Sequence, residues 1–187
     1  MKLLQPLKYL TIKHEEKRWY DIWYPLAASL IVVLVYWFID KPFSILGKNG
    51  LIPQINGLLQ ILIGFYIASL AAIATFSNKN IDSVMAGTPP TVKEKVNGKY
   101  RAIPLIRRRF LCYLFGYLAL AGFILFGVGL IMILFSPQLE HSVSMIHYDS
   151  SLKIFKTLFV WGYTFALANI VSTTLLGLYY LTVRIHQ

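Results

Sequence analysis

The sequence predicts an all-α membrane protein in which four transmembrane helices form a single integral membrane domain over residues 1–187. Two observations predict this class. Of the 187 residues, 57% are hydrophobic and only 14% are charged, whereas soluble domains average about 25% charged residues. Four apolar runs, at about 23–39, 55–76, 110–135 and 157–181, also approach or exceed the ~20 residues that a helix needs to cross a bilayer.

The first apolar run begins only near Trp23, after a polar and aromatic N-terminal arm. A cleavable signal peptide would place its apolar stretch earlier, so we expect the first span to stay in the protein. Leu3, Leu7, Leu10 and Tyr9 are spaced loosely as one helical face. They predict a short interfacial amphipathic helix, with a partner-docking arm as the alternative. Four aromatic residues that favour the headgroup level follow: Trp19, Tyr20, Trp23 and Tyr24.

Small and polar residues recur at helical spacing in two of the spans. Small residues on one face allow another helix to approach closely, so we expect these rows to pack helices together or to hold a homo-oligomer. The second-span row consists of Gln60, Gly64, Ala68 and Ala72, and Asn56 continues it one turn earlier. The fourth-span row consists of Gly162, Ala166, Asn169, Thr173 and Gly177.

No Asp, Glu, Lys or Arg lies within the four expected spans. Such residues inside a membrane usually mark a proton or ion path. The most notable polar side chains there are those of Gln60, Ser69, Asn169 and Thr173. Hydrogen bonding between helices is favoured for them over the lining of a pore. Cys112 is the only cysteine, so an intrachain disulfide is excluded.

The segment 77–109, between the second and third spans, contains eight of the 18 Lys and Arg and is opposed only by Asp82 and Glu94. Cations in short loops beside membrane spans stay on the cytoplasmic side. With both termini inside, all Lys and Arg but four lie on the inner side. The four outer ones are Lys41, Lys48, Lys153 and Lys156. This asymmetry predicts that both termini, and the long basic loop, are cytoplasmic.

The basic loop has three interpretations: topology with phospholipid contact, docking of a cytosolic protein, and nucleic-acid binding. Docking gains support from AGTPPTV (86–92), an extended segment that a partner could hold. Single-stranded nucleic acid would favour more aromatic residues among the cations, so we expect no direct nucleic-acid contact. The candidate docking residues are Lys79, Lys93, Lys95, Lys99, Tyr100, Arg101, Arg107, Arg108 and Arg109.

No motif for catalysis, a cofactor or a metal is present in the sequence. The second outer loop contains residue types that bind metals, at a spacing that matches no motif: Glu140, His141, His147 and Asp149. There is no phosphate-binding or dinucleotide-binding glycine loop. We therefore expect no enzymatic activity, no cofactor and no metal.

Four stretches resemble the KwaA family, the small four-span membrane subunits of the Kiwa bacterial antiphage defence system. They are GFYIASLAAIATF (64–76), AGTPPT (86–91), RRRFLCYLFGYLAL (107–120) and GLYYLTVRIH (177–186). The resemblance extends over the whole chain in layout. It implies a homo-oligomeric protein of the bacterial inner membrane that senses phage and recruits a cytosolic, DNA-binding partner subunit.

Three functions remain to be compared. The prediction is a membrane sensor and scaffold that oligomerises and docks a cytosolic effector. The alternative is an oligomeric channel-like or membrane-permeabilising protein, which conductance in reconstituted bilayers would distinguish. A membrane enzyme acting on lipid or peptidoglycan lacks a plausible acid, base or nucleophile apart from His141 and His147.

Overall fold

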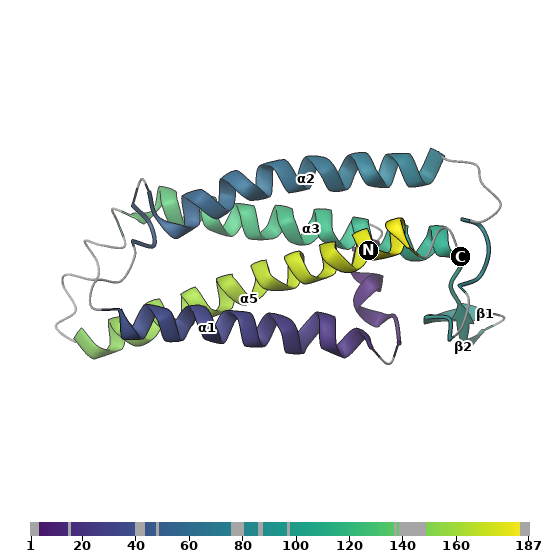
Figure 1. Ribbon diagram of the computed structural model, residues 1–187, viewed down its shortest axis with the longest axis horizontal. Coiled ribbons are helices and arrows are strands. Elements are labelled where there is room, and N and C mark those ends of the chain that lie inside the picture. Colours follow the sequence, from purple (N-terminus) through teal and green to yellow (C-terminus); the bar gives the residue numbers. More distant parts are fainter. Residues whose placement is uncertain are drawn as a thin grey trace.

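Four long helices form the body of the protein (Figure 1). The computed structural model describes residues 4–14, 16–39, 44–47, 49–75, 81–85, 88–96, 98–136, 138 and 149–183. The long helices are α1 (Tyr24–Phe38), α2 (Leu51–Thr75), α3 (Arg107–Leu134) and α5 (Asp149–Thr182). Among the described residues, four helical stretches are long and apolar enough to cross a membrane. They indicate a multi-pass membrane protein and confirm the four helices expected from the sequence.

The helix bounds differ from the expected spans by a few residues. α2 begins at Leu51 rather than Ile55, because Pro53 falls in the first helical turn, where its missing N–H needs no partner. The apolar stretch of the first span begins at Trp19, since the short π-helix η2 (Trp19–Trp23) leads directly into α1. At the other end of α1, Trp37 Nε1 donates a hydrogen bond to Thr157 Oγ1 of α5 at 3.1 Å.

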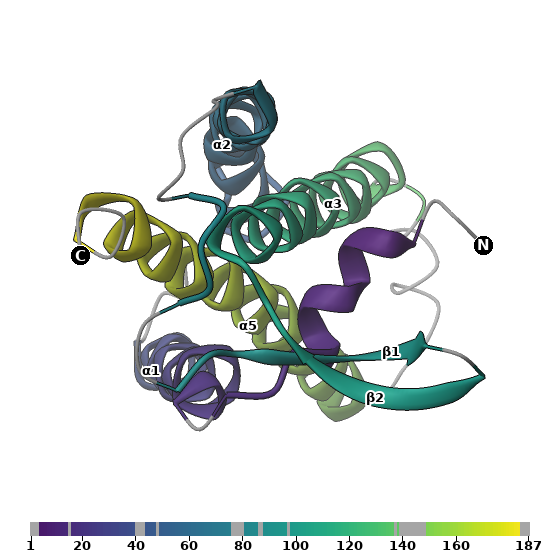
Figure 2. The same ribbon diagram turned by 90° about the vertical axis from the view of Figure 1, so that its right-hand side faces the viewer.

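The helices pack in the order α1, α5, α3 and α2, which the end-on view shows (Figure 2). The best-buried side chains lie where α2, α3 and α5 meet. Tyr66, Leu114, Phe115 and Leu118 are fully buried there, whereas many large apolar side chains on the outer faces are exposed, such as Ile61 at 72%. Exposed apolar surface of this extent is what a lipid-facing helix requires.

The chain is not all helical, so the all-α prediction is wrong for one segment. In the basic segment, β1 (Thr91–Val96) pairs antiparallel with β2 (Lys99–Pro104). The turn contains Gly98, whose φ of +81° is a conformation that glycine adopts without steric cost. In the sequence, Asn97-Gly98 between extended residues is a strong signal for a short hairpin. The hairpin lies beyond one end of the helices, which we call the hairpin end (Figure 1).

The N-terminal arm differs from the expected interfacial helix. It forms a 3₁₀-helix, η1 (Gln5–Thr11), that packs against α3. Tyr9 is fully buried, and its ring stacks on that of Tyr117 with the centroids 4.9 Å apart. After η1, Lys13 forms an isolated β-bridge with Thr91 of β1. The arm is therefore an internal part of the fold that connects α3 with the hairpin.

Candidate functional site

The hairpin presents a cationic and aromatic surface, which we define as the hairpin face: Lys93, Lys99, Tyr100 and Arg101. All four side chains are exposed, and Tyr100 reaches 75%. In β2, only Ile103 is partly buried. Tyr and Arg are over-represented among residues that dominate protein interfaces, so Tyr100 and Arg101 are the members of this surface best suited to a protein contact.

Arg107, Arg108 and Arg109, by contrast, are engaged inside the fold. Arg107 is only 8% exposed. The Arg108 guanidinium donates to both carboxylate oxygens of Asp82, at 2.6 and 3.0 Å, and to the Ile73 carbonyl near the end of α2 at 2.6 Å. These hydrogen bonds lower the pKa of the Asp82 carboxyl. Arg108 therefore caps α2 and holds it to α3, because cations stabilise the unpaired carbonyls at a helix C-terminus.

Arg109 connects α3 with the hairpin. It forms an ion pair with Glu94 of β1 and donates a hydrogen bond to Tyr113 Oη at 3.2 Å. Glu94 also lies 3.8 Å from Lys8 Nζ of η1. The structure thus separates the nine predicted docking residues. Arg109 contacts the hairpin through Glu94, Arg108 caps α2, Arg107 is buried, and the hairpin face is exposed. Lys95 pairs with Tyr100 in the backbone register, and Lys79 lies outside the described residues.

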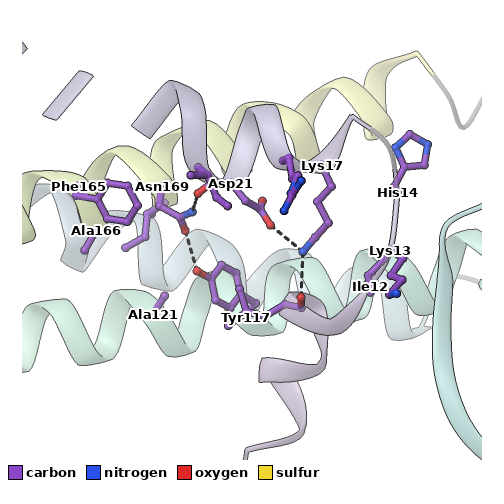
Figure 3. A pocket seen from close by; sticks show the side chains of 14 residues that line it. Ile12, Lys13, His14, Lys17, Asp21, Tyr117, Ala121, Phe165, Ala166 and Asn169 are labelled. Atoms are coloured by element: carbon purple, nitrogen blue, oxygen red, sulfur yellow. Dashed lines mark hydrogen bonds and ion pairs between the residues drawn. The ribbon is translucent and has the colours of Figure 1, made fainter. Parts of the chain in front are cut away.

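A second polar group lies between the helices and was not predicted. We call it the Asp21 cluster: Tyr9, Lys17, Asp21, Tyr117 and Asn169. Lys17 Nζ lies 2.7 Å from Asp21 Oδ2, and Tyr9 Oη donates to Asp21 Oδ1 at 3.2 Å. Tyr117 Oη donates to Asn169 Oδ1 at 2.7 Å, and Asn169 Nδ2 donates to the Asp21 carbonyl at 2.9 Å (Figure 3). The cluster joins the arm, η2, α3 and α5.

The Asp21 cluster corrects the expectation that no ionisable residue lies within a span. Asp21 falls inside the first membrane-spanning stretch, Trp19–Phe38, and is paired with a cation as buried charges must be. Burial, and next the Asp21 carboxylate, raise the pKa of the Tyr9 hydroxyl, so Tyr9 stays a neutral hydrogen-bond donor. Lys17 and Asp21 are four residues apart, a spacing that predicts contact on a helix. This spacing is the feature of the sequence that could have predicted the ion pair.

Beside the Asp21 cluster is a cavity of about 840 Å³ (Figure 3). Its rim is formed by the basic side chains Lys13, Lys17 and Arg18 together with His14. Its wall is mostly apolar, and it includes Ala121, Phe165, Ala166 and Ile170. The cavity lies where the arm, η2, α3 and α5 come together, so its lining comes from segments far apart in the sequence.

Other polar side chains within the helices bond to each other. Tyr163 Oη donates to Asn56 Oδ1 at 3.1 Å, and the two polar atoms pass close to Gly129, where a Cβ would lie 2.5 Å from that oxygen. Tyr66 Oη and Thr174 Oγ1 are 2.6 Å apart. These contacts, like those of Asn169, are bonds between helices, as expected for polar residues in spans.

The two predicted rows of small residues have opposite environments. In the second-span row, Gln60, Gly64, Ala68 and Ala72 are all exposed on the outer face of α2. In the fourth-span row, Asn169, Thr173 and Gly177 are buried, Ala166 is partly buried and lines the cavity, and Gly162 is exposed. Most of the fourth-span row therefore packs within the protomer, and the second-span row is a free surface.

No family model, curated protein or solved structure matches the chain. Among the described residues, no three potential metal ligands are close together; Glu140, His141 and His147 fall outside that part of the chain. The described geometry consequently offers two sites: the hairpin face and the cavity beside the Asp21 cluster.

Proposed function

We propose that the protein is a sensor and scaffold subunit of a bacterial antiphage defence complex, which docks a cytosolic effector through the hairpin face. It would sit in the inner membrane as a homo-oligomer with its hairpin end in the cytoplasm. The cation asymmetry of the sequence supports that orientation, and the resemblance to the Kiwa membrane subunits supports the defence role. No bound nucleic acid is required, because the partner would supply the DNA contact.

The observation that carries the proposal is the exposed hairpin face on a firmly anchored hairpin. Arg109 and Lys8 both contact the Glu94 carboxylate of β1. The backbones of Lys13 and Thr91 form two hydrogen bonds, of 2.9 and 3.2 Å. A surface that is rigid before binding loses less conformational entropy when a partner docks. Its positive charge would accelerate encounter with an acidic partner and make binding sensitive to salt.

The test reverses the charge of four hairpin residues, Lys93, Lys95, Lys99 and Arg101, to Glu. We expect normal insertion, loss of the co-purified cytosolic partner and loss of protection from phage. The residues that anchor the hairpin are unchanged, so folding should be preserved. The matched control replaces Lys153 and Lys156 by Glu and should keep the partner. These two exposed cations lie at the other end of α5. If the inserted quadruple variant retains its partner at ordinary salt, the docking role of the hairpin is wrong.

A further inference from the structure

We propose that the cavity beside the Asp21 cluster binds one anionic phospholipid, with its phosphate at the basic rim and an acyl chain along the apolar wall. This inference rests on the proposed placement of the hairpin end at the cytoplasmic membrane surface. It adds a lipid ligand to a protein otherwise proposed to bind proteins, and it concerns a different site from the hairpin face.

The rim has an excess of positive charge. Lys13, Lys17 and Arg18 border the cavity, and Asp21 is the carboxylate among its lining residues. Lys17 already neutralises that carboxylate at 2.7 Å, which leaves Lys13 and Arg18, both exposed, to attract an anion. The backbone of Lys13 is fixed to Thr91 by two hydrogen bonds, so this cation projects from an ordered position.

The wall favours hydrocarbon over a soluble polar ligand. Ile22, Ala121, Phe165, Ala166 and Ile170 contribute apolar surface. The polar atoms beside them are already bonded, because Tyr117 donates to Asn169 and Asn169 donates to the Asp21 carbonyl. A volume of about 840 Å³ falls within the usual range of ligand cavities. It accommodates a headgroup and the first part of an acyl chain, whose remainder would extend into the bilayer.

The depth of the rim agrees with a headgroup position. Trp19, Trp23 and Tyr24 follow the rim residues directly and are 57%, 53% and 55% exposed. Trp and Tyr concentrate at the membrane–water interface, so the rim lies at or just outside this level. Basic pockets between transmembrane helices on the cytoplasmic side bind anionic headgroups. Charge, wall and depth together point to a phospholipid.

The experiment measures lipid binding by native mass spectrometry of the full chain, titrated with phosphatidylglycerol, cardiolipin or phosphatidylcholine. The rim variant carries Lys13→Gln and Arg18→Gln; Lys17 is kept because its ion pair is structural. The matched control carries Lys153→Gln and Lys156→Gln at the other end of α5. A third variant, Ala166→Leu, fills the wall without changing charge.

We expect the unaltered chain to prefer the two anionic lipids over phosphatidylcholine. The rim variant should bind anionic lipid about tenfold more weakly, since each cation near a membrane surface contributes a part of the attraction. Ala166→Leu should reduce the binding of all three lipids, and the control should match the unaltered chain. Equal anionic preference in the rim variant and the control would overturn the proposal.

Two further results would also overturn it. Competition by millimolar inorganic phosphate would identify a site for a soluble anion, and loss of the oligomer in the rim variant would identify a second copy as the occupant. The assay uses the protein without its partner, and the rim variant leaves the hairpin face intact. A failure of lipid binding is therefore distinguishable from a failure of partner docking.

Discussion

The second-span and fourth-span rows have the same pattern in the sequence and opposite positions in the structure. Gly177 of the fourth-span row is buried against α3, where an added Cβ would lie 2.9 Å from Leu114 Cδ2. A Cβ added at Gly64 of the second-span row would meet no atom within 4 Å, and Gln60 on the same face is exposed. One row packs the protomer, and the other presents a helix face to whatever surrounds it.

The difference shows what a row of small residues does and does not specify. Small side chains permit close approach of a second helix, but they carry no information on which chain provides that helix. Burial provides this information, because Asn169 of the inward row accepts a hydrogen bond from Tyr117 of α3 and donates one to the Asp21 carbonyl of η2. An exposed amide in a membrane-spanning helix is unfavourable in lipid, and the proposed homo-oligomer would cover Gln60 with a second copy.

The largest effect is expected from Gly177→Leu. The added side chain would overlap with Leu114 and Phe115 of α3, and overpacking of this kind destabilises by about 1–3 kcal/mol. Gly162→Leu is the control in the same row, since nothing lies within 4 Å of its Cβ position. Denaturation of the two variants in mixed detergent micelles measures the difference. Equal stability would mean that the fourth-span row does not pack against α3.

A smaller loss of stability is expected from Asn169→Ala. The change removes two hydrogen bonds and leaves the Tyr117 hydroxyl without its acceptor, a cost of about 1 kcal/mol in a membrane protein. Gln60→Ala, in the exposed row, should leave the protomer's stability unchanged. A double-mutant cycle with Tyr117→Phe isolates the pair. Strict additivity in that cycle would show that the two side chains do not interact.

The helices were predictable from the sequence, and their arrangement was not. Apolar runs identify spans because a bilayer requires every backbone group to bond within its helix. The hairpin was missed because the prediction for 77–109 rested on its charge and on AGTPPTV. Asn97-Gly98 between extended residues is the hairpin signal in this segment. The arm was misplaced because the burial of Tyr9 depends on α3, which lies about a hundred residues further along the chain.

The candidate sites show the same limit. Lys93, Lys99, Tyr100 and Arg101 were predicted as docking residues. The structure leaves their side chains exposed on β1 and β2, as is usual for charged residues, and their docking role stays a prediction. The role of Arg108 in capping α2 could not be predicted, since it requires the contact with Ile73. The cavity was missed altogether, because its rim and its wall belong to separate segments that only the folded chain brings together.

Replacement of Gly64 and Ala68 by Leu, singly, tests the exposed row. We expect each protomer to stay within about 0.5 kcal/mol of the original stability, because open surface positions tolerate added bulk. The oligomer ladder after crosslinking in detergent should be reduced. Gly162→Leu, the same change on an exposed position of α5, shows whether the loss is specific to α2. An unchanged ladder in both α2 variants would remove this row from the oligomer contact.

The smallest effect is expected from the ion pair between Asp82 and Arg108. Arg108 also binds the Ile73 carbonyl near the end of α2. The Asp82 carboxyl has a pKa below its ordinary value of 3.8, through hydrogen bonds from Arg108 and then their charge attraction. A carboxyl whose pKa is lowered in the folded state stabilises the fold at any pH above its ordinary pKa. This contribution is lost as the pH falls through the pKa of the folded state.

Asp82→Asn should therefore lower the Tm slightly at neutral pH. The difference from the unaltered chain should disappear once the pH has fallen through the lowered pKa of Asp82. Arg108→Lys keeps the charge but loses the forked geometry. In a chain with this change, Asp82→Asn should therefore lower the Tm by less than it does in the unaltered chain. A Tm difference between the Asp82 variant and the unaltered chain that is independent of pH would show that the charge of this ion pair does not hold α2.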